Sequence, residues 1–179
     1  MDEKPSYLGL LNAVSIAETD AGQYLAAWAA VTPSKDVQAV INTIALRETE
    51  HGLAFAKRID ELGFSVIPKT DPKHAERMAI ASSTALSDKE KFEALGLGRA
   101  PQNGAPDVFD KFFENKDLDP VTGGLLGRYV AEERDSGRKF AACYSLLCAA
   151  AEANGAKANG HKAKAKAVKD GKGKKAKKK

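Results

Sequence analysis

The sequence predicts an all-α protein with a basic C-terminal tail. Apolar residues recur at alternating spacings of three and four over long stretches, which is the period of a helix that buries one face. The chain shows no alternation of apolar and polar residues and no hairpin turn signal that would indicate strands. Its last segment consists mainly of lysine and alanine.

The first two predicted helices form a hairpin. Residues 5–31 are rich in alanine and leucine, and the helix-breaking segment 32–34 follows them. Ser34 is a favourable N-cap for a second helix. We expect this helix to end near Leu62, because Gly63 supplies a C-terminal stop.

The next part of the chain allows two interpretations. After a loop over 64–71, Pro72 fits the first position of a third helix. This helix either continues to Leu95 or ends before Ser87. Ser87 and Glu90 have the spacing of a capping box, which would begin a short new helix.

The last part of the folded region is expected to be one long helix. Residues 97–124 are rich in proline and glycine and are predicted to be irregular, with a short helix near 108–114. A long helix is predicted over 122–152. Together these elements form one helical domain over 1–154, and residues 155–179 form a separate tail.

Three of the predicted helices carry a carboxylate in the middle of the apolar seam, the row of apolar residues that faces the core. These seam positions are Glu18, Glu48 and Glu133, and His51 shares the seam of Glu48. Burying an unpaired carboxylate costs several kcal/mol or keeps it protonated, so a bound cation is the common explanation. Glu18 and Glu48 each lie fifteen residues from Pro33, so we expect them to face each other about 22 Å from the turn.

A fifth candidate ligand, Asp88, depends on the shape of the third helix. If that helix is continuous, its seam points Asp88 toward the other acids. If Ser87 caps a new helix, Asp88 lies in the first turn, where an acid is favoured in any case. Glu132 and Asp135 lie on a stripe that the periodicity assigns to solvent, so Glu133 is preferred to them as a ligand.

Glycines inside the predicted helices are a further feature near the candidate ligands. They are Gly22, Gly52, Gly127 and Gly137. Each costs a helix up to about 1 kcal/mol relative to alanine. Close approach of two helices, or room beside a metal, would offset this cost.

Glu18 and the sequence Glu-Thr-Glu-His at 48–51 resemble the first half of a ferritin-like (rubrerythrin-like) di-iron carboxylate four-helix bundle. The resemblance covers about residues 5–152 and implies that these residues bind iron. In the second half, Ser136 stands where the family has the histidine of its second Glu-x-x-His motif. The resemblance therefore implies one or two iron ions, with the second position short of ligands.

The resemblance also implies iron oxidation or reaction with oxygen or peroxide. The chain has no Cys-x-x-Cys iron module of the rubrerythrin kind, so any electrons would come from an external donor. An iron-dependent hydroxylase is an alternative. The same side chains also fit a buried hydrogen-bonded cluster without a metal, in a bundle that serves only as a scaffold.

The tail is strongly basic, whereas the rest of the chain is acidic. Residues 155–179 carry eleven lysines and one acid, and the remainder has a net charge of −6. With one valine and no aromatic residue, the tail is expected to be disordered. It resembles the tails of linker histones, and lysine suits phosphate contacts without base recognition. The predicted nucleic-acid-binding residues are Lys157, Lys162, Lys164, Lys166, Lys169, Lys172, Lys174, Lys175, Lys177, Lys178 and Lys179.

Two classes of function follow from these patterns. The first is an iron-binding bundle held on DNA or RNA by its tail, and the second is a metal-free scaffold whose tail binds or compacts nucleic acid. No apolar run reaches membrane-spanning length and no secretion leader is recognised, so we expect a cytoplasmic protein with Cys143 and Cys148 reduced. If the tail binds DNA, the protein would be associated with the nucleoid. A homo-oligomer is compatible with both classes.

Overall fold

The computed structural model describes residues 4–98 and 109–173, the stretch 154–173 by its backbone alone. Within these ranges the chain is helical and contains no strand, as predicted. None of the described helices is long and apolar enough to cross a membrane. The elements in chain order are α1 (Leu8–Val31), α2 (Lys35–Glu61), α3 (His74–Ser82), α4 (Asp88–Ala94), the 3-10 helix η1 (Asp110–Phe113) and α5 (Pro120–Gly173).

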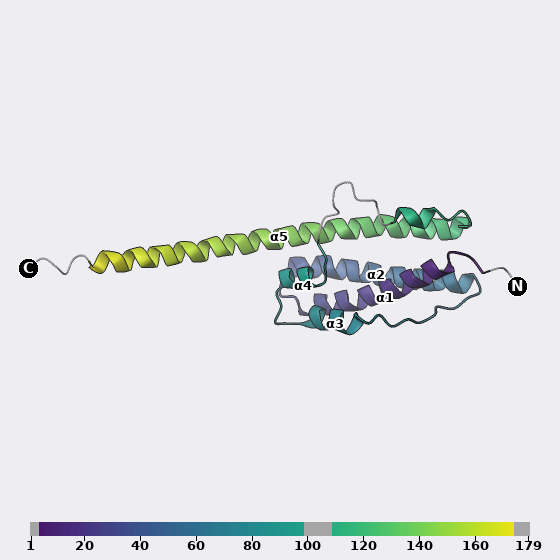
Figure 1. Cartoon of the computed structure of the whole chain (residues 1–179), viewed down its shortest axis with the longest axis horizontal. Coiled ribbons are helices and arrows are strands. Elements are labelled where there is room, and N and C mark those ends of the chain that lie inside the picture. The colour runs from purple at the N-terminus through teal and green to yellow at the C-terminus, as the bar shows by residue number, and fades with distance from the viewer. Residues whose placement is uncertain (1–3, 99–108, 174–179) are drawn as a thin grey trace, which may run out of the picture.

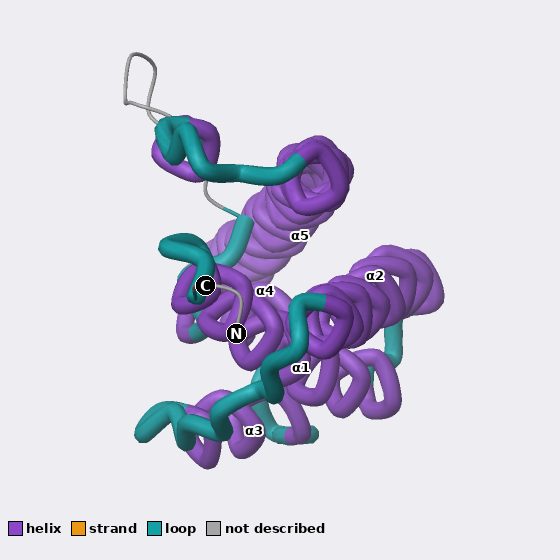
Figure 2. Tube along the Cα trace, turned by 90° about the vertical axis from the view of Figure 1, so that its right-hand side faces the viewer, coloured by secondary structure: helices purple, strands orange, loops and turns teal. Residues whose placement is uncertain are grey.

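Helices α1 and α2 form an antiparallel hairpin whose turn lies where the sequence predicts it, although α1 begins at Leu8, three residues after the predicted start. The Ser34 side chain accepts a hydrogen bond from the backbone N–H of Val37 at 3.3 Å, as expected of an N-cap. After α2, Gly63 adopts a φ of +81°, in the left-handed region that favours glycine. Figure 1 shows α5 running along this hairpin, with the short α3 and α4 beside it, and Figure 2 shows the same helices nearly end-on.

Two glycines let α1 and α2 approach each other closely. A Cβ atom on Gly22 would meet Thr49 Oγ1 and lie 3.1 Å from Thr49 N, and a Cβ atom on Gly52 would lie 2.5 Å from Thr19 Oγ1. The two contacts correspond because both helices carry the pattern Glu-Thr-x-x-Gly, thirty residues apart. The hairpin therefore has an approximate internal two-fold arrangement.

The third and fourth helices are separate, as the capping-box interpretation predicts. Ser87 Oγ accepts a hydrogen bond from the Glu90 N–H at 3.3 Å, and the Glu90 carboxylate accepts one from the Ser87 N–H at 2.8 Å. Helix α3 begins at His74 rather than at Pro72, because residues 72 and 73 form the turn that precedes it. It ends at Ser82, so the continuous helix is excluded.

Helix α5 begins two residues before the prediction, with Pro120 in its first position. The Asp119 carboxylate accepts hydrogen bonds from the N–H groups of Val121 and Thr122, at 2.9 and 3.0 Å. Before it, η1 confirms a short helix in the proline-rich region. The rest of that prediction, over 99–108, lies outside the described residues.

The last part of α5 extends past the ends of the other helices (Figure 1). Its backbone is helical through Gly173, which includes most of the predicted tail. Helices without tertiary packing are marginal in water, so the disorder expected of residues 155–179 stays a prediction. Residues 174–179 lie outside the described part of the chain.

The core consists of two apolar clusters separated by a polar layer. We define the polar layer as Glu18, Glu48, His51 and Glu133. On each of α1, α2 and α5, one cluster lies before the polar-layer residues in the chain and the other cluster lies after them. The order on α2 is the reverse of that on α1 and α5, because α2 runs antiparallel to α1. The cluster near the α1–α2 turn is built mainly around Leu25, Trp28, Ile41, Ile44, Phe92 and Phe140. The cluster at the opposite end is built mainly around Leu8, Leu11, Phe55, Ile59, Leu126 and Tyr129.

Candidate metal centre

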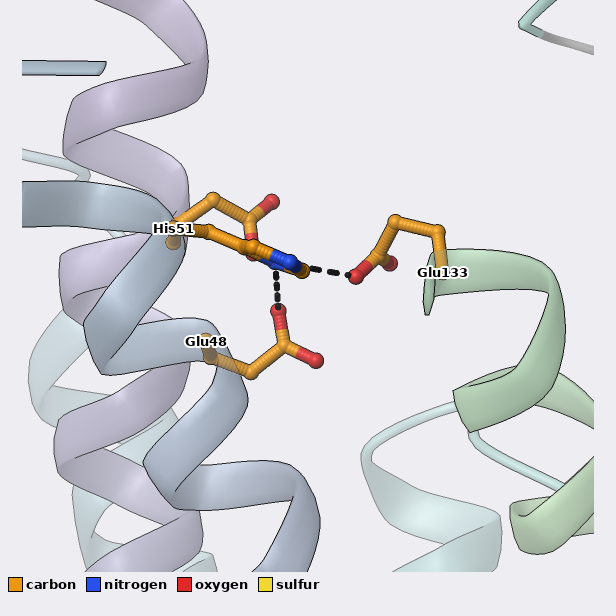
Figure 3. A group of neighbouring side chains, drawn as sticks. Glu48, His51 and Glu133 are labelled. Atoms are coloured by element: carbon orange, nitrogen blue, oxygen red, sulfur yellow. Dashed lines mark ion pairs between the residues drawn. The ribbon is translucent and has the colours of Figure 1, made fainter. Parts of the chain in front are cut away.

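The structure brings the four residues of the polar layer together from three helices. Glu18 lies on α1, Glu48 and His51 lie on α2, and Glu133 lies on α5. One potential ligand atom from each residue lies within 4.8 Å of those from the other three. Figure 3 shows Glu48 and Glu133 directed toward the His51 ring from α2 and α5. Glu18, Glu48 and His51 are only 7%, 5% and 4% exposed.

Three of the facing atoms are buried without a hydrogen-bond partner among the described residues: Glu18 Oε2, His51 Nδ1 and Glu133 Oε1. His51 Nδ1 lies 3.7 Å from Glu18 Oε2 and 3.5 Å from Glu133 Oε1. It lies 3.9 Å from Glu48 Oε2. These separations are too long for good hydrogen bonds. They are close to the distance of about 3.4 Å between ligands of a tetrahedral ion with bonds of about 2.1 Å.

The other ring nitrogen of His51 contacts Glu132, which helical periodicity assigns to solvent. His51 Nε2 lies 2.7 Å from Glu132 Oε2. A proton on Nε2 that is donated to Glu132 leaves the lone pair of Nδ1 directed at the three acids. Arg128 Nε donates to the other oxygen of Glu132 at 3.0 Å, which fixes its orientation. Such carboxylate–histidine pairs orient the metal-binding histidines of other proteins, so Glu132 belongs to the candidate site although the sequence pattern assigns it to solvent.

Tyr129 fixes the orientation of Glu18. Its hydroxyl donates a hydrogen bond of 2.8 Å to Glu18 Oε1, which leaves Oε2 facing the centre. The Tyr129 ring also packs edge-on against His51, with ring centroids 5.0 Å apart. Burial and the nearby Glu18 raise the pKa of Tyr129 well above its ordinary value, so the phenol remains a donor.

The crowding of acids around one imidazole shifts their pKa values. Burial raises the pKa of Glu48, and the adjacent Glu18 raises it further, to about 11. Burial alone would lower the pKa of His51, but the facing carboxylates, Glu133 first, raise it to about 10. Burial opposes ionisation of Glu18, yet His51 and its other partners lower the pKa of Glu18. Without a cation, the layer is therefore expected to hold one proton on Glu48 and a second proton on His51 at neutral pH.

The donor set fits one transition-metal ion. An imidazole nitrogen together with three carboxylates suits Fe(II), Mn(II) or Zn(II), and their binding would displace the protons of Glu48 and His51. A ferritin-like di-iron centre takes four glutamates and two histidines. The described residues gather fewer ligands than that, which favours one ion.

Asp88 does not lie with the other predicted ligands, which corrects that expectation. Its Oδ1 accepts a hydrogen bond of 2.7 Å from Trp28 Nε1, and its Oδ2 accepts one of 2.7 Å from Thr32 Oγ1. Both oxygens thus tie the start of α4 to the end of α1. The capping box at Ser87 begins a new helix, so the seam of a continuous helix does not exist there.

The predicted nucleic-acid-binding lysines divide into two groups. Lys157 to Lys172 lie in the part of α5 described by its backbone alone, and Lys174 to Lys179 lie outside the described residues.

A comparison of the chain with models of protein families, with curated proteins and with solved structures found no match. What the polar layer does must therefore be inferred from the geometry of this chain.

Proposed function

We propose that the protein is a ferritin-like helical bundle that binds one iron ion through Glu18, Glu48, His51 and Glu133. Its role would be iron oxidation or reaction with oxygen or peroxide. The observation that carries the proposal is the set of three buried, unpartnered atoms that face one another across the polar layer. A metal-free polar cluster would be expected to pair these atoms by hydrogen bonds.

The residues around the ion have separate tasks in this proposal. Iron supplies a redox couple and open coordination positions. Glu132 holds the proton of His51 Nε2 and orients the ring, and Tyr129 holds Glu18. The two apolar clusters border the centre on either side along the helices. An external donor would supply any electrons.

Iron loading tests the proposal directly. Wild-type protein incubated anaerobically with Fe(II) and then desalted is expected to retain about one iron ion per chain. Glu48→Ala and His51→Ala each remove a ligand from the buried centre, so iron affinity should fall by at least about 100-fold in each. Iron is counted by atomic emission, and helical content is checked by circular dichroism.

Glu50→Ala is the matched control for iron loading. Glu50 lies on the same helix, but it is exposed and pairs with Arg128. This variant should retain as much iron as the wild-type protein. Equal iron in all four proteins, or almost none in the wild-type protein, would contradict the proposed centre.

A second role, proposed for the tail, is to hold the protein on nucleic acid without sequence preference. The observation that favours it is the eleven lysines of residues 155–179 beside a body with a net charge of −6. A metal-free scaffold with a nucleic-acid-binding tail is the alternative if the iron test fails. In that case the tail would be the functional part.

Truncation after Asn154 is expected to abolish binding to duplex DNA while leaving iron loading unchanged. If about eight lysines contact phosphates, the log affinity of the full chain should fall against log salt with a slope near −7. Filter retention of labelled duplex DNA at several salt concentrations measures both effects. Equal retention of the full and truncated chains would show that the tail is not the binding element.

A further inference from the structure

A cavity of about 800 Å³ lies beside the polar layer. Three of the four proposed iron ligands, Glu18, Glu48 and Glu133, line its inner end. Most of the remaining wall near them consists of small or apolar side chains from α1 and from the segments packed beside it. These residues are Ala13, Ile16, Ala17, Ala21, Leu25, Leu97 and Phe140.

One position in the repeated Glu-Thr-x-x-Gly pattern leaves this side of the centre open. On α2, His51 follows Glu48 by three residues and directs Nδ1 at the acids. On α1, the residue three positions after Glu18 is Ala21, which lines the cavity instead. An ion in the polar layer is thus covered by an imidazole on the α2 side and has space for another ligand on the α1 side.

The charges at the outer end of the cavity largely neutralise one another. Arg77 Nη2 lies 3.0 Å from Asp20 Oδ2 and also pairs with Asp71. His74 contacts Asp20 as well. Among the described lining residues, the cations are Arg77 and Lys69, and Lys69 lies on the exposed rim. An anionic ligand inside would lie beside three carboxylates, and a cationic ligand would compete with the metal.

We propose that this cavity binds a neutral, largely apolar small molecule whose inner end lies at the open side of the iron. The volume lies in the range of small-molecule sites, which are typically lined by apolar side chains with a few polar groups among them. The position of the inner end depends on the proposed iron site. The binding of an apolar molecule by the cavity does not depend on it.

Eight-carbon probes that differ only in their head group test the ligand class. Isothermal titration calorimetry of metal-free protein should show one site for 1-octanol, with at least about tenfold weaker binding of octanoate. In Co(II)-loaded protein, where the metal neutralises the three carboxylates, octyltrimethylammonium should also bind at least about tenfold more weakly than 1-octanol. Equal affinity for the two probes in either comparison, or no 1-octanol binding by the wild-type protein, would overturn the proposal.

Ala21→Phe fills the cavity and should weaken 1-octanol binding at least about tenfold. Ala17→Phe, at an exposed position of the same wall, provides a second variant if the first does not fold. Ala26→Phe is the control, because Ala26 is exposed on the same helix and does not line this cavity. Unchanged 1-octanol binding by folded Ala21→Phe and Ala17→Phe would place the probe elsewhere and reject the cavity.

Octanohydroxamate tests the position of the inner end, because its head group binds metals. In Co(II)-loaded protein it should shift the visible absorption bands of Co(II), and Ala21→Phe should prevent the shift. No shift in the loaded wild-type protein would reject contact between the ligand and the metal. Protein that binds 1-octanol but no iron would leave the cavity proposal standing and reject the iron centre. Protein that binds iron but no 1-octanol would reject the cavity proposal and leave the iron centre standing.

Discussion

Glu48→Gln is expected to hold little iron and yet to be more stable than the wild-type protein when both are metal-free above neutral pH. The amide has the shape of the protonated acid and cannot ionise. The pKa of Glu48 is raised to about 11 in the folded protein from its ordinary value of 4.5, so between these values only the folded state keeps the proton. The wild-type free energy of unfolding therefore falls as pH rises, by at most about 1.4 kcal/mol per pH unit for this group. The free energy of unfolding of Glu48→Gln does not fall with pH for this reason.

His51 also makes the free energy of unfolding fall as pH rises, in both the wild-type protein and Glu48→Gln. Its folded pKa of about 10 exceeds the ordinary value of 6.5, so its stabilising effect is complete below about pH 6.5 and disappears as pH rises through 10. Glu18, whose pKa is lowered, acts in the opposite direction: its contribution is present above 4.5 and is lost on acidification. The difference in free energy of unfolding between the wild-type protein and Glu48→Gln therefore isolates the contribution of the Glu48 proton.

Urea unfolding of chelator-treated proteins from about pH 6 to pH 9 measures this difference. Glu50→Gln makes the same change at an exposed residue and should follow the wild-type curve. Anaerobic Fe(II) should reverse the order, because it stabilises only protein that binds it. Parallel pH dependences of wild type and Glu48→Gln would show that Glu48 does not carry a buried proton.

Gly52→Val is expected to destabilise the protein by about 3 kcal/mol. Even a Cβ atom at Gly52 would lie 2.5 Å from Thr19 Oγ1 and 3.0 Å from Thr19 N. The backbone atom cannot rotate away, so α1 and α2 must separate at this point. Because His51 is the adjacent residue, the separation should also weaken iron binding.

Gly127→Ala and Gly137→Ala are the controls for Gly52→Val. At neither position would an added Cβ come within 4 Å of another described part of the chain outside the local helix backbone, so alanine should stabilise α5 by up to about 1 kcal/mol at each. Chemical unfolding at fixed pH and iron titration measure the two effects. If Gly52→Val lowered the free energy of unfolding by less than an ordinary surface substitution does, α1 and α2 would not need to be in close contact at Gly52.

The helices and the four members of the polar layer were predictable because one periodic pattern determines both. A residue on the seam of a long amphipathic helix must face the core, so the direction of Glu18, Glu48, His51 and Glu133 follows from their spacing. Asp88 was ambiguous because two helix boundaries fitted the same residues. The hydrogen bonds of the capping box, which sequence alone cannot weigh against the seam, decide it.

Glu132 was missed for a different reason. Periodicity gives the direction of a Cβ atom, but a glutamate side chain can turn toward a partner that lies beside the seam. The available signal was chemical: a metal-binding histidine needs a partner for its second ring nitrogen, and an acid adjoins Glu133. Gly137 shows the opposite limit, since no close approach of another helix within the described part of the chain explains this glycine.

The position of the polar layer between two apolar clusters also constrains how the hairpin assembles. Apolar residues recur along both α1 and α2, so apolar side chains would still face one another after a slip of one turn, about 5.4 Å. Such a slip would move Glu48 toward one of the two apolar clusters, where an acid is costly to bury. The acids thus penalise competing alignments before any ion binds. The side chains proposed to hold iron would then also select the one pairing of α1 with α2 in which iron can be held.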